Sequence, residues 1–326
     1  MNRSCFASAL ALAVSCCLFS GKTFAQQPDP ICAGKTMAAH GEVNIAYTSE
    51  GPKQGEVVVL VPGSGQHAED WPTALIQGLL EYGYRVLKLD PRDVGCSTHL
   101  DAKGPVDWTA LFAQLGKGEK PSTAYTAQDM AGDVIAVMDH ANVKKAHIIG
   151  ASAGATVSGW LASEQPERVS SLVLLMANSG NPLNPMPADP ARMASAGMPP
   201  AAGASIEARR TFLAAMNKAL EADEPTRSPE AFNKWLDAAS TRHIDGDGLA
   251  RTGAAMLAAG DLRARLSSIE APTLVVHGAK DPLVAVAAGK EVAEAIPSAQ
   301  WHLEPKMGHS INDGTVVAVQ EFIQKH

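Results

Sequence analysis

The sequence has 326 residues, of which 46% are hydrophobic and 19% are charged, and its formal net charge is -7. This length and hydrophobic fraction are typical of a globular protein with one large domain that carries an insertion. An acidic chain without a run of basic residues is a poor ligand for nucleic acid, so we expect no nucleic-acid partner.

The first 25 residues have the pattern of a secretory signal peptide. Arg3 gives a basic start, residues 5–19 form an apolar run, and Thr23-Phe24-Ala25 places small residues where a signal peptidase cuts. The run is shorter than the roughly 20 apolar residues that span a bilayer. We therefore predict cleavage after Ala25, a secreted or periplasmic mature protein and no stable membrane insertion; an uncleaved N-terminal anchor is the alternative.

Three of the five cysteines lie in the predicted signal peptide, which leaves Cys32 and Cys96 in the mature chain. In an oxidising compartment these two residues could form a disulfide, or they could remain two buried thiols. The sequence leaves both possibilities open. Without a Cys-x-x-Cys motif or a cluster of Cys and His, a structural zinc site is not expected.

Strand and helix patterns alternate along most of the chain. The run Val57-Val58-Val59-Leu60-Val61 is continuously apolar, as in strands that are buried on both faces of a parallel sheet. The alternation predicts an α/β fold, with a mostly parallel central sheet and helices on both of its faces. Strands are predicted at 43–49, 56–61, 84–89, 146–149, 171–176, 272–277 and 299–303, and helices at 71–82, 127–140, 153–163, 285–296 and 315–324.

The alternation stops between residues 179 and 266, where helical patterns appear at 209–220 and 229–239. An insertion between two strands lies over the carboxyl edge of the sheet, where ligands bind in open α/β sheets. We therefore predict a helical cap or lid over 179–266, on a core formed by 26–178 and 267–326.

A second, smaller interruption runs from Leu100 to Tyr125. Its apolar residues Trp108, Leu111 and Phe112 are expected to anchor it to the core.

The motif Gly150-Ala151-Ser152-Ala153-Gly154 follows a predicted strand and begins a predicted helix. In this arrangement the serine sits in a sharp, strained turn that exposes its hydroxyl at the edge of the sheet, and its partners follow in the order acid, then histidine. A neutral serine needs a base to become a nucleophile. Asp281 and His309 each follow a late strand and lie at the same edge as the serine. We predict Ser152 as the nucleophile, His309 as the base and Asp281 as the acid that orients the base.

Some of these residues also allow a purely structural interpretation. The glycine motif could be a structural turn, and Asp281 could be an ordinary turn residue before Pro282. Asp313 is the rival acid, although its position better fits the N-terminal cap of the last helix. His277 ends a strand and is expected to be a packed, hydrogen-bonded residue.

An oxyanion hole requires two backbone N–H groups. One is expected from Ala153, the residue after the nucleophile, and the other from Ser64 in the loop after the early strand, Val61-Pro62-Gly63-Ser64-Gly65. The alternative for this loop is a tight glycine-rich turn with no such role. A phosphate-binding loop is not indicated, because the Gly-x-x-x-x-Gly-Lys pattern is absent.

The run Asp90-Pro91-Arg92-Asp93-Val94-Gly95-Cys96-Ser97 resembles the D-x-R-x-x-G-x-S segment of α/β-hydrolase-fold enzymes, and residues 128–154 and 262–282 are similar too. The aclacinomycin methylesterase-like group of serine esterases is especially similar, because it shares the pairs Arg92-Asp93 and Trp71-Pro72. The resemblance is specific for the fold and the triad, weak for the substrate, and weakest across the cap.

The chain departs from these relatives at two positions. Many have His where it has Pro62, and many have a larger residue where it has Ala153. Both departures leave the backbone N–H donors intact, and both could widen the acyl pocket. Arg92 and Asp93 are expected to form an ion pair that braces their loop, without a catalytic role.

These features predict a serine hydrolase that cleaves a small-molecule carboxylic ester through an acyl-enzyme on Ser152, with no cofactor or metal. The same triad could cleave amides, lactones or carbon–carbon bonds, or form peracids as cofactor-free haloperoxidases do. A binding protein with a hydrolase fold and a lipase with a lipid-facing lid are further alternatives. The acyl group, the alcohol and the oligomeric state are left open.

Overall fold

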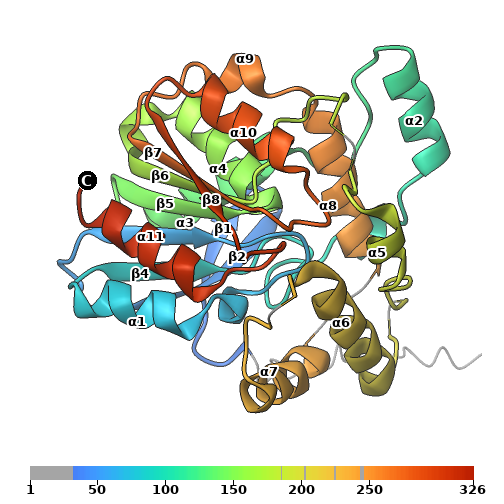
Figure 1. Ribbon diagram of the computed structural model, residues 1–326, viewed down its shortest axis with the longest axis horizontal. Coiled ribbons are helices and arrows are strands. Elements are labelled where there is room, and N and C mark those ends of the chain that lie inside the picture. The colour runs from blue at the N-terminus through green and yellow to red at the C-terminus, as the bar shows by residue number, and fades with distance from the viewer. Residues whose placement is uncertain (1–31, 185, 202, 224, 243–245) are drawn as a thin grey trace, which may run out of the picture. The chain divides into compact units, whose positions relative to one another are not determined.

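The central sheet has eight strands in the order β1-β2-β4-β3-β5-β6-β7-β8 (Figure 1). β1 pairs with β2 and β2 with β4 in antiparallel register, and every other pair is parallel. The mostly parallel sheet of the sequence prediction is therefore confirmed. The strands are β1 (Thr36–His40), β2 (Val43–Glu50), β3 (Val57–Val61), β4 (Arg85–Leu89), β5 (Ala146–Ala151), β6 (Val169–Leu175), β7 (Thr273–Gly278) and β8 (Ala299–Glu304).

This computed structural model describes residues 32–184, 186–201, 203–223, 225–242 and 246–326. The predicted signal peptide and its cleavage site after Ala25 lie outside the described residues. The fold is formed by Gly34–His326, the second of two units of the chain, which follows Met1–Ala33. Within the described ranges, no helix is both long and apolar enough to cross a bilayer.

β3 shows why helices must cover both faces of the sheet. Val57, Val59 and Val61 point into one hydrophobic cluster, and Val58 and Leu60 point into the other. Side chains alternate between the faces of a strand, so a continuous apolar run requires cover on both sides. One face is covered by α1 (Thr73–Glu81) and α11 (Asp313–Ile323), and the other by α3 (Ala127–His140), α4 (Ala153–Glu164) and α10 (Val286–Ala295).

The described residues between β6 and β7 form five α-helices, of which α5 to α8 gather beyond one end of the strands (Figure 1). The chain leaves the sheet and returns to it at adjacent points, because the N–H of Leu262 donates to the carbonyl of Ser179 at 2.8 Å. Gly180 lies so close to Gly260 that an added Cβ would be 1.9 Å from the Gly260 oxygen. The helices are α5 (Pro190–Ala194), α6 (Ile206–Leu220), α7 (Pro229–Thr241), α8 (Gly246–Ala259) and α9 (Arg263–Leu266).

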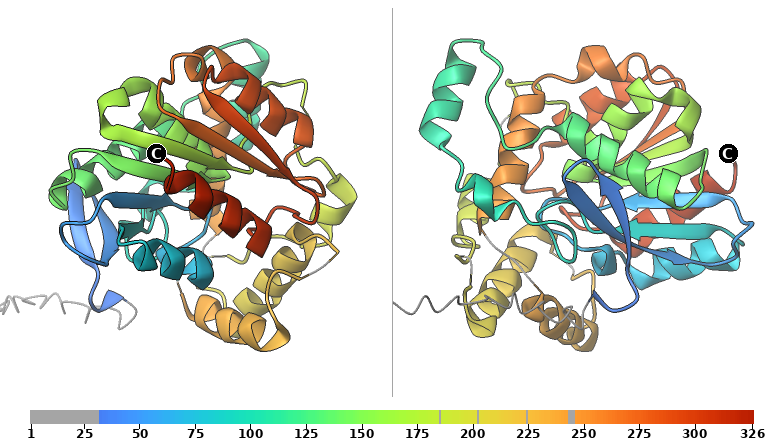
Figure 2. Two further views of the ribbon diagram at one scale, coloured as in Figure 1. Left: turned by 60° about the vertical axis from the view of Figure 1, so that its left-hand side comes forward. Right: turned by 180° about the vertical axis from the view of Figure 1, so that it is seen from behind.

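The smaller interruption contains a short 3-10 helix, Asp101–Lys103, and the α-helix α2 (Trp108–Gly116), which stands out from the neighbouring helices (Figure 2). Leu111 is buried, as expected, but Trp108 and Phe112 are 37% and 57% exposed. Their rings stack on each other at 6.0 Å. The expectation that these residues anchor the segment is wrong for Phe112, whereas Trp108 packs against α8, since an added Cβ at Gly253 would lie 3.6 Å from its ring.

Cys32 and Cys96 are each disulfide-bonded. Neither is the free buried thiol that the sequence allowed.

Candidate active site

Ser152 is the single residue between β5 and α4, and it has φ 54° and ψ -117°. This backbone conformation costs a non-glycine residue about 1–3 kcal/mol, so it persists only where the surrounding structure enforces it. The flanking glycines let the neighbouring backbone segments pack closely enough to hold Ser152 in this conformation. An added Cβ on Gly150 would lie 2.4 Å from the Gly154 oxygen, and one on Gly154 would lie 2.1 Å from the Val61 oxygen.

The structure brings the three predicted residues into one hydrogen-bonded chain. His309 Nε2 lies 3.0 Å from Ser152 Oγ, and His309 Nδ1 lies 2.8 Å from Asp281 Oδ2. The other carboxylate oxygen, Asp281 Oδ1, accepts hydrogen bonds from the N–H groups of Leu283 and Val284 at 2.9 and 2.8 Å. The carboxylate therefore presents Oδ2 to the imidazole, as a residue that orients a base must.

Asp281 is almost fully buried, yet it is held in the ionised form. Burial by itself raises the pKa of the Asp281 carboxyl, but the His309 ring and the Val284 N–H lower the pKa more, so that it lies below its ordinary value. An ionised carboxylate beside the ring stabilises the imidazolium that forms when the base takes a proton.

Residues 61–65, the predicted oxyanion loop, lie directly against Ser152, since an added Cβ on Gly63 would be 3.3 Å from Ser152 Cβ. The N–H of Gly63 is already engaged, because it donates to the side chain of Gln66 at 2.9 Å. The N–H groups of Ser64 and Ala153 donate to no acceptor in the part of the chain that the structure describes. Two free donors thus lie at the positions predicted from the sequence. Gln66 was not predicted, because its bond to Gly63 leaves no sequence pattern.

Arg92 and Asp93 brace their loop, but they do not pair with each other. Arg92 forms two hydrogen bonds of 2.7 Å to Asp133 on α3, and Arg251 on α8 forms two of 2.8 Å to Asp93. All four side chains are buried. The predicted bracing role is correct, whereas the expected partner is wrong, because Asp93 has φ 63° and turns the chain between the two residues.

The inserted helices contact the loops that carry the acid and the base. The last residue of α6, Leu220, accepts a hydrogen bond from the N–H of His309 at 2.7 Å. Gly308 packs against the same point, because an added Cβ would lie 2.4 Å from the Leu220 oxygen. The N–H of Asp189 donates to the carbonyl of Pro282, next to the acid, at 2.7 Å.

A second set of contacts joins the insertion to the oxyanion loop and to the short 3-10 helix that follows it, Ala68–Asp70. Asp70 Oδ1 accepts hydrogen bonds from Trp235 Nε1 at 2.9 Å and from Arg242 Nη1 at 2.8 Å. Leu249 of α8 reaches Gly65, whose added Cβ would be 3.4 Å from Leu249 Cδ1. The insertion therefore touches the loops that carry Asp281 and His309 and the loop that follows β3.

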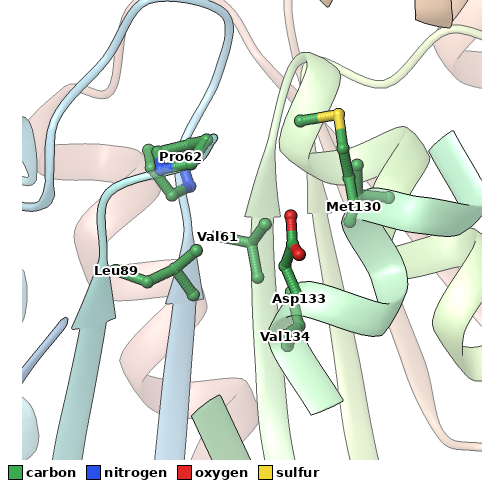
Figure 3. A pocket seen from close by; sticks show the side chains of 8 residues that line it. Val61, Pro62, Leu89, Met130, Asp133 and Val134 are labelled. Carbon is green, nitrogen blue, oxygen red and sulfur yellow. The ribbon is translucent and has the colours of Figure 1, made fainter. Parts of the chain in front are cut away.

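A small cavity lies behind the oxyanion loop, beside Val61 and Pro62, with the carboxylate of Asp133 in its wall (Figure 3). Its volume is about 10 Å³, which is room for roughly one water molecule. The cavity is too small for an ester substrate.

Two groups of side chains in the described ranges have a spacing that could hold a metal ion. In each group, however, one carboxylate is already paired with a lysine or arginine side chain. Lys35 Nζ lies 2.6 Å from Asp90 in the first group, and Arg251 pairs with Asp93 in the second. The groups are His67, Glu69 and Asp90, and Asp93, His99 and Asp101.

Residues 56–314 match a family described as the alpha/beta hydrolase fold. The chain belongs to this family. The predicted fold and resemblance are thereby confirmed. Among solved structures, the meta-cleavage product hydrolase CumD from Pseudomonas fluorescens is similar with a TM-score of 0.65 at 22% identity, over 89% of this chain and 97% of that one.

Several hydrolases are similar in sequence to this member of the family. A putative carbamate hydrolase, RutD, from Variovorax paradoxus is 32% identical over 81% of this chain and 88% of its own. A 2-hydroxy-6-oxononadienedioate/2-hydroxy-6-oxononatrienedioate hydrolase from Pseudomonas putida is 27% identical over 78% and 81%. The rhodomycin D methylesterase DnrP from Streptomyces peucetius is 24% identical over 84% and 92%. Their names support a hydrolase, and they differ in the bond that is cleaved.

Proposed function

We propose that this alpha/beta hydrolase cleaves a carboxylic ester of a small molecule through an acyl-enzyme on Ser152. The observation that carries the proposal is the continuous hydrogen-bonded chain from Ser152 through His309 to Asp281, beside the two free N–H groups of Ser64 and Ala153. A nucleophile, a base, an acid and an oxyanion site within one edge of a sheet form the set that acyl transfer requires.

The reaction follows from this geometry in two steps. Ser152 Oγ attacks the acyl carbon while its proton passes to His309 Nε2, and the N–H groups of Ser64 and Ala153 bind the oxygen that becomes negative. His309 then gives the proton to the alcohol oxygen, which leaves. A water molecule next attacks the acyl carbon, His309 takes its proton and returns it to Ser152, and the carboxylic acid is released.

The insertion over 179–266 is proposed as the cap that forms the substrate pocket. Its contacts with Pro282, His309, Gly65 and Asp70 support this role, because a segment that touches all of these loops borders any ligand bound there. The acyl and alcohol specificity is expected to reside in this segment.

Export through a cleaved signal peptide, to the periplasm or the exterior, is also part of the proposal. The disulfide-bonded state of Cys32 and Cys96 suits an oxidising compartment. The N-terminal sequence of the secreted protein tests it, with Gln26 expected as the first residue.

Hydrolysis of a carbamate is the second candidate. It is favoured by the 32% identity to the putative carbamate hydrolase of Variovorax paradoxus, and the same nucleophile and base would serve both reactions. A panel of matched methyl esters, carbamates, amides and vinylogous diketones, which contain a cleavable carbon–carbon bond, distinguishes these classes by relative kcat/KM.

The direct test is labelling of the mature protein with a fluorophosphonate, read by intact mass, with Ser152→Ala beside it. A single adduct on the wild type and none on the variant is the expected result, because only an activated serine attacks phosphorus at neutral pH. A well-folded wild type that forms no adduct would contradict the serine-hydrolase mechanism and would favour a ligand-binding role.

A further inference from the structure

A second histidine, His277, lies against the acid of the triad. It is in β7, one residue before the strand ends, and its side chain is completely buried. Its Nε2 is 3.5 Å from Asp281 Oδ2, the same oxygen that contacts His309. The reaction described above uses His277 in no step.

The hydrogen bonds of His277 define its tautomer. Nε2 lies 3.0 Å from the carbonyl oxygen of Val284, which can only accept, so Nε2 carries the proton. Nδ1 is buried and has no partner among the described residues. Burial lowers the pKa of His277 despite the opposing effects of the Val284 carbonyl and the Asp281 carboxylate, so the ring is neutral. Asp281 and His309 are the titratable groups that act on it.

The ring of His277 is held in one orientation by its neighbours. On α10, an added Cβ at Gly289 would lie 2.1 Å from Nδ1, so the helix approaches the ring as closely as a glycine permits. On β8, the ring of Trp301 stacks on it at 6.1 Å with an interplanar angle of 29°. The direction of the Nε2–H is therefore set by packing as well as by its hydrogen bond.

Val284 connects this fixed ring to the carboxylate. Its N–H donates to Asp281 Oδ1 at 2.8 Å, and its carbonyl accepts from His277 Nε2 at 3.0 Å. Val284, the last residue of the turn from Asp281, is thus bonded through its N–H to the carboxylate of Asp281 and through its carbonyl to the buried histidine.

We propose that His277 is a positioning residue for the hydrolysis, which donates its Nε2–H to the Val284 carbonyl and so fixes the turn that aims Asp281 Oδ2 at His309. This inference rests on the proposed function. A ring with a merely structural role would fill space between α10 and β8 without affecting the hydrogen bond between Asp281 and His309.

Two variants separate these roles. His277→Gln keeps an N–H near the position of Nε2, and His277→Leu removes it; both lose the stack on Trp301. The measurements are the strongly deshielded proton resonance of the Asp281–His309 hydrogen bond, kcat and KM on a generic ester, and the melting temperature. We expect similar melting temperatures, loss of the resonance in His277→Leu only, and a fall in its kcat on the order of 100-fold at unchanged KM. His277→Gln is expected to retain the resonance and to stay within about threefold of the wild-type kcat.

The proposal is overturned if His277→Leu keeps the resonance, or if both variants lose activity in proportion to their loss of stability. Because the resonance needs no turnover, it tests His277 even if the protein cleaves no ester. Should His277→Leu fail to fold, Gly289→Ala is the second variant: its methyl group displaces the ring, and loss of the resonance is again expected.

Discussion

The backbone N–H of His309 donates a hydrogen bond of 2.7 Å to the carbonyl oxygen of Leu220, the last residue of α6. The final carbonyls of a helix have no partner within it, and here one of them is satisfied by His309, the proposed base. The position of the base therefore depends on a helix of the insertion as well as on the core. Gly308 allows the end of α6 to lie this close to His309, because it has no side chain between the two segments.

Gly308→Ala is expected to lower kcat/KM at least about tenfold, because the methyl group would lie 2.4 Å from the Leu220 oxygen and 2.7 Å from the Ala222 nitrogen. Ester kinetics and the rate of fluorophosphonate labelling measure the effect. Gly116→Ala is the matched control, since nothing lies within 4 Å of its added Cβ. Equal activity of the two variants would contradict a role for this contact.

Removal of the acid is expected to cost about 10⁴-fold in kcat, the size found when the aspartate of a serine protease triad is replaced by asparagine. Asp281→Asn keeps the shape of the side chain while removing the charge that stabilises the imidazolium. Single-turnover kinetics on an activated ester measure the loss. A reduction of less than tenfold would mean that another group, such as Asp313, acts as the acid.

The same substitution has a pH-dependent effect on stability. The pKa of Asp281 is lower in the folded protein than in the unfolded chain, so its contribution to folding is fully present above the unfolded pKa, about 3.9. It is lost as pH falls through the folded pKa. Urea unfolding should therefore show a gap between wild type and Asp281→Asn at pH 6 that shrinks as the medium becomes strongly acidic. An equal difference in the free energy of unfolding at pH 6 and in strongly acidic medium would contradict the lowered pKa.

Asp93→Ala is expected to destabilise the protein by about 3–5 kcal/mol, because Arg251 would lose its buried carboxylate, and its contact with the exposed Asp101 is longer. The side chains of Asp93 and Arg251 are inaccessible to solvent, at 0% and 1% exposure. Asp139→Ala is the comparison, since Asp139 pairs with Arg168 but is mostly exposed, and such pairs contribute about 0–1 kcal/mol. Urea unfolding measures both, and similar losses for the two variants would contradict the burial argument.

Gln66→Leu is expected to lower kcat by about tenfold or more with little change in KM. Its side chain holds the N–H of Gly63, and the neighbouring Ser64 N–H is proposed to bind an oxygen whose charge appears only in the transition state. Gln66→Glu keeps an acceptor for Gly63 and should retain most of the activity. An effect of Gln66→Leu on KM alone would place the residue in substrate binding.

The parts of the fold that could be predicted are those with a local signal. The run 57–61 was correctly assigned to a buried strand, and Ser152 was placed between a strand and a helix by its flanking glycines. β1 (Thr36–His40) has no strand signal in the sequence, because it contains no β-branched apolar or aromatic residue and its only fully buried side chain is the small Ala38. α8 (Gly246–Ala259) was missed because its three glycines, at 246, 248 and 253, are poor helix formers.

Contacts between distant segments leave no such signal. The last helix was expected to be capped by Asp313, but Asn312 accepts the hydrogen bond from the Thr315 N–H, one residue earlier. His277 was expected to be packed and hydrogen-bonded, which is confirmed. Its closeness to Asp281 depends on the turn through Val284, and the sequence does not reveal that turn.

The two ends of the insertion lie next to each other at Gly180 and Gly260, which suits the replacement of the whole segment. Both joins lie at one place on the sheet, so a segment from another member of the family could be grafted between them without cutting a strand. A graft must keep glycine at 180, since any side chain there would strike the returning chain at 1.9 Å. Ser152, Asp281 and His309 all lie outside 180–260, so such a graft would replace the proposed cap and leave the hydrogen-bonded chain of these three residues in place.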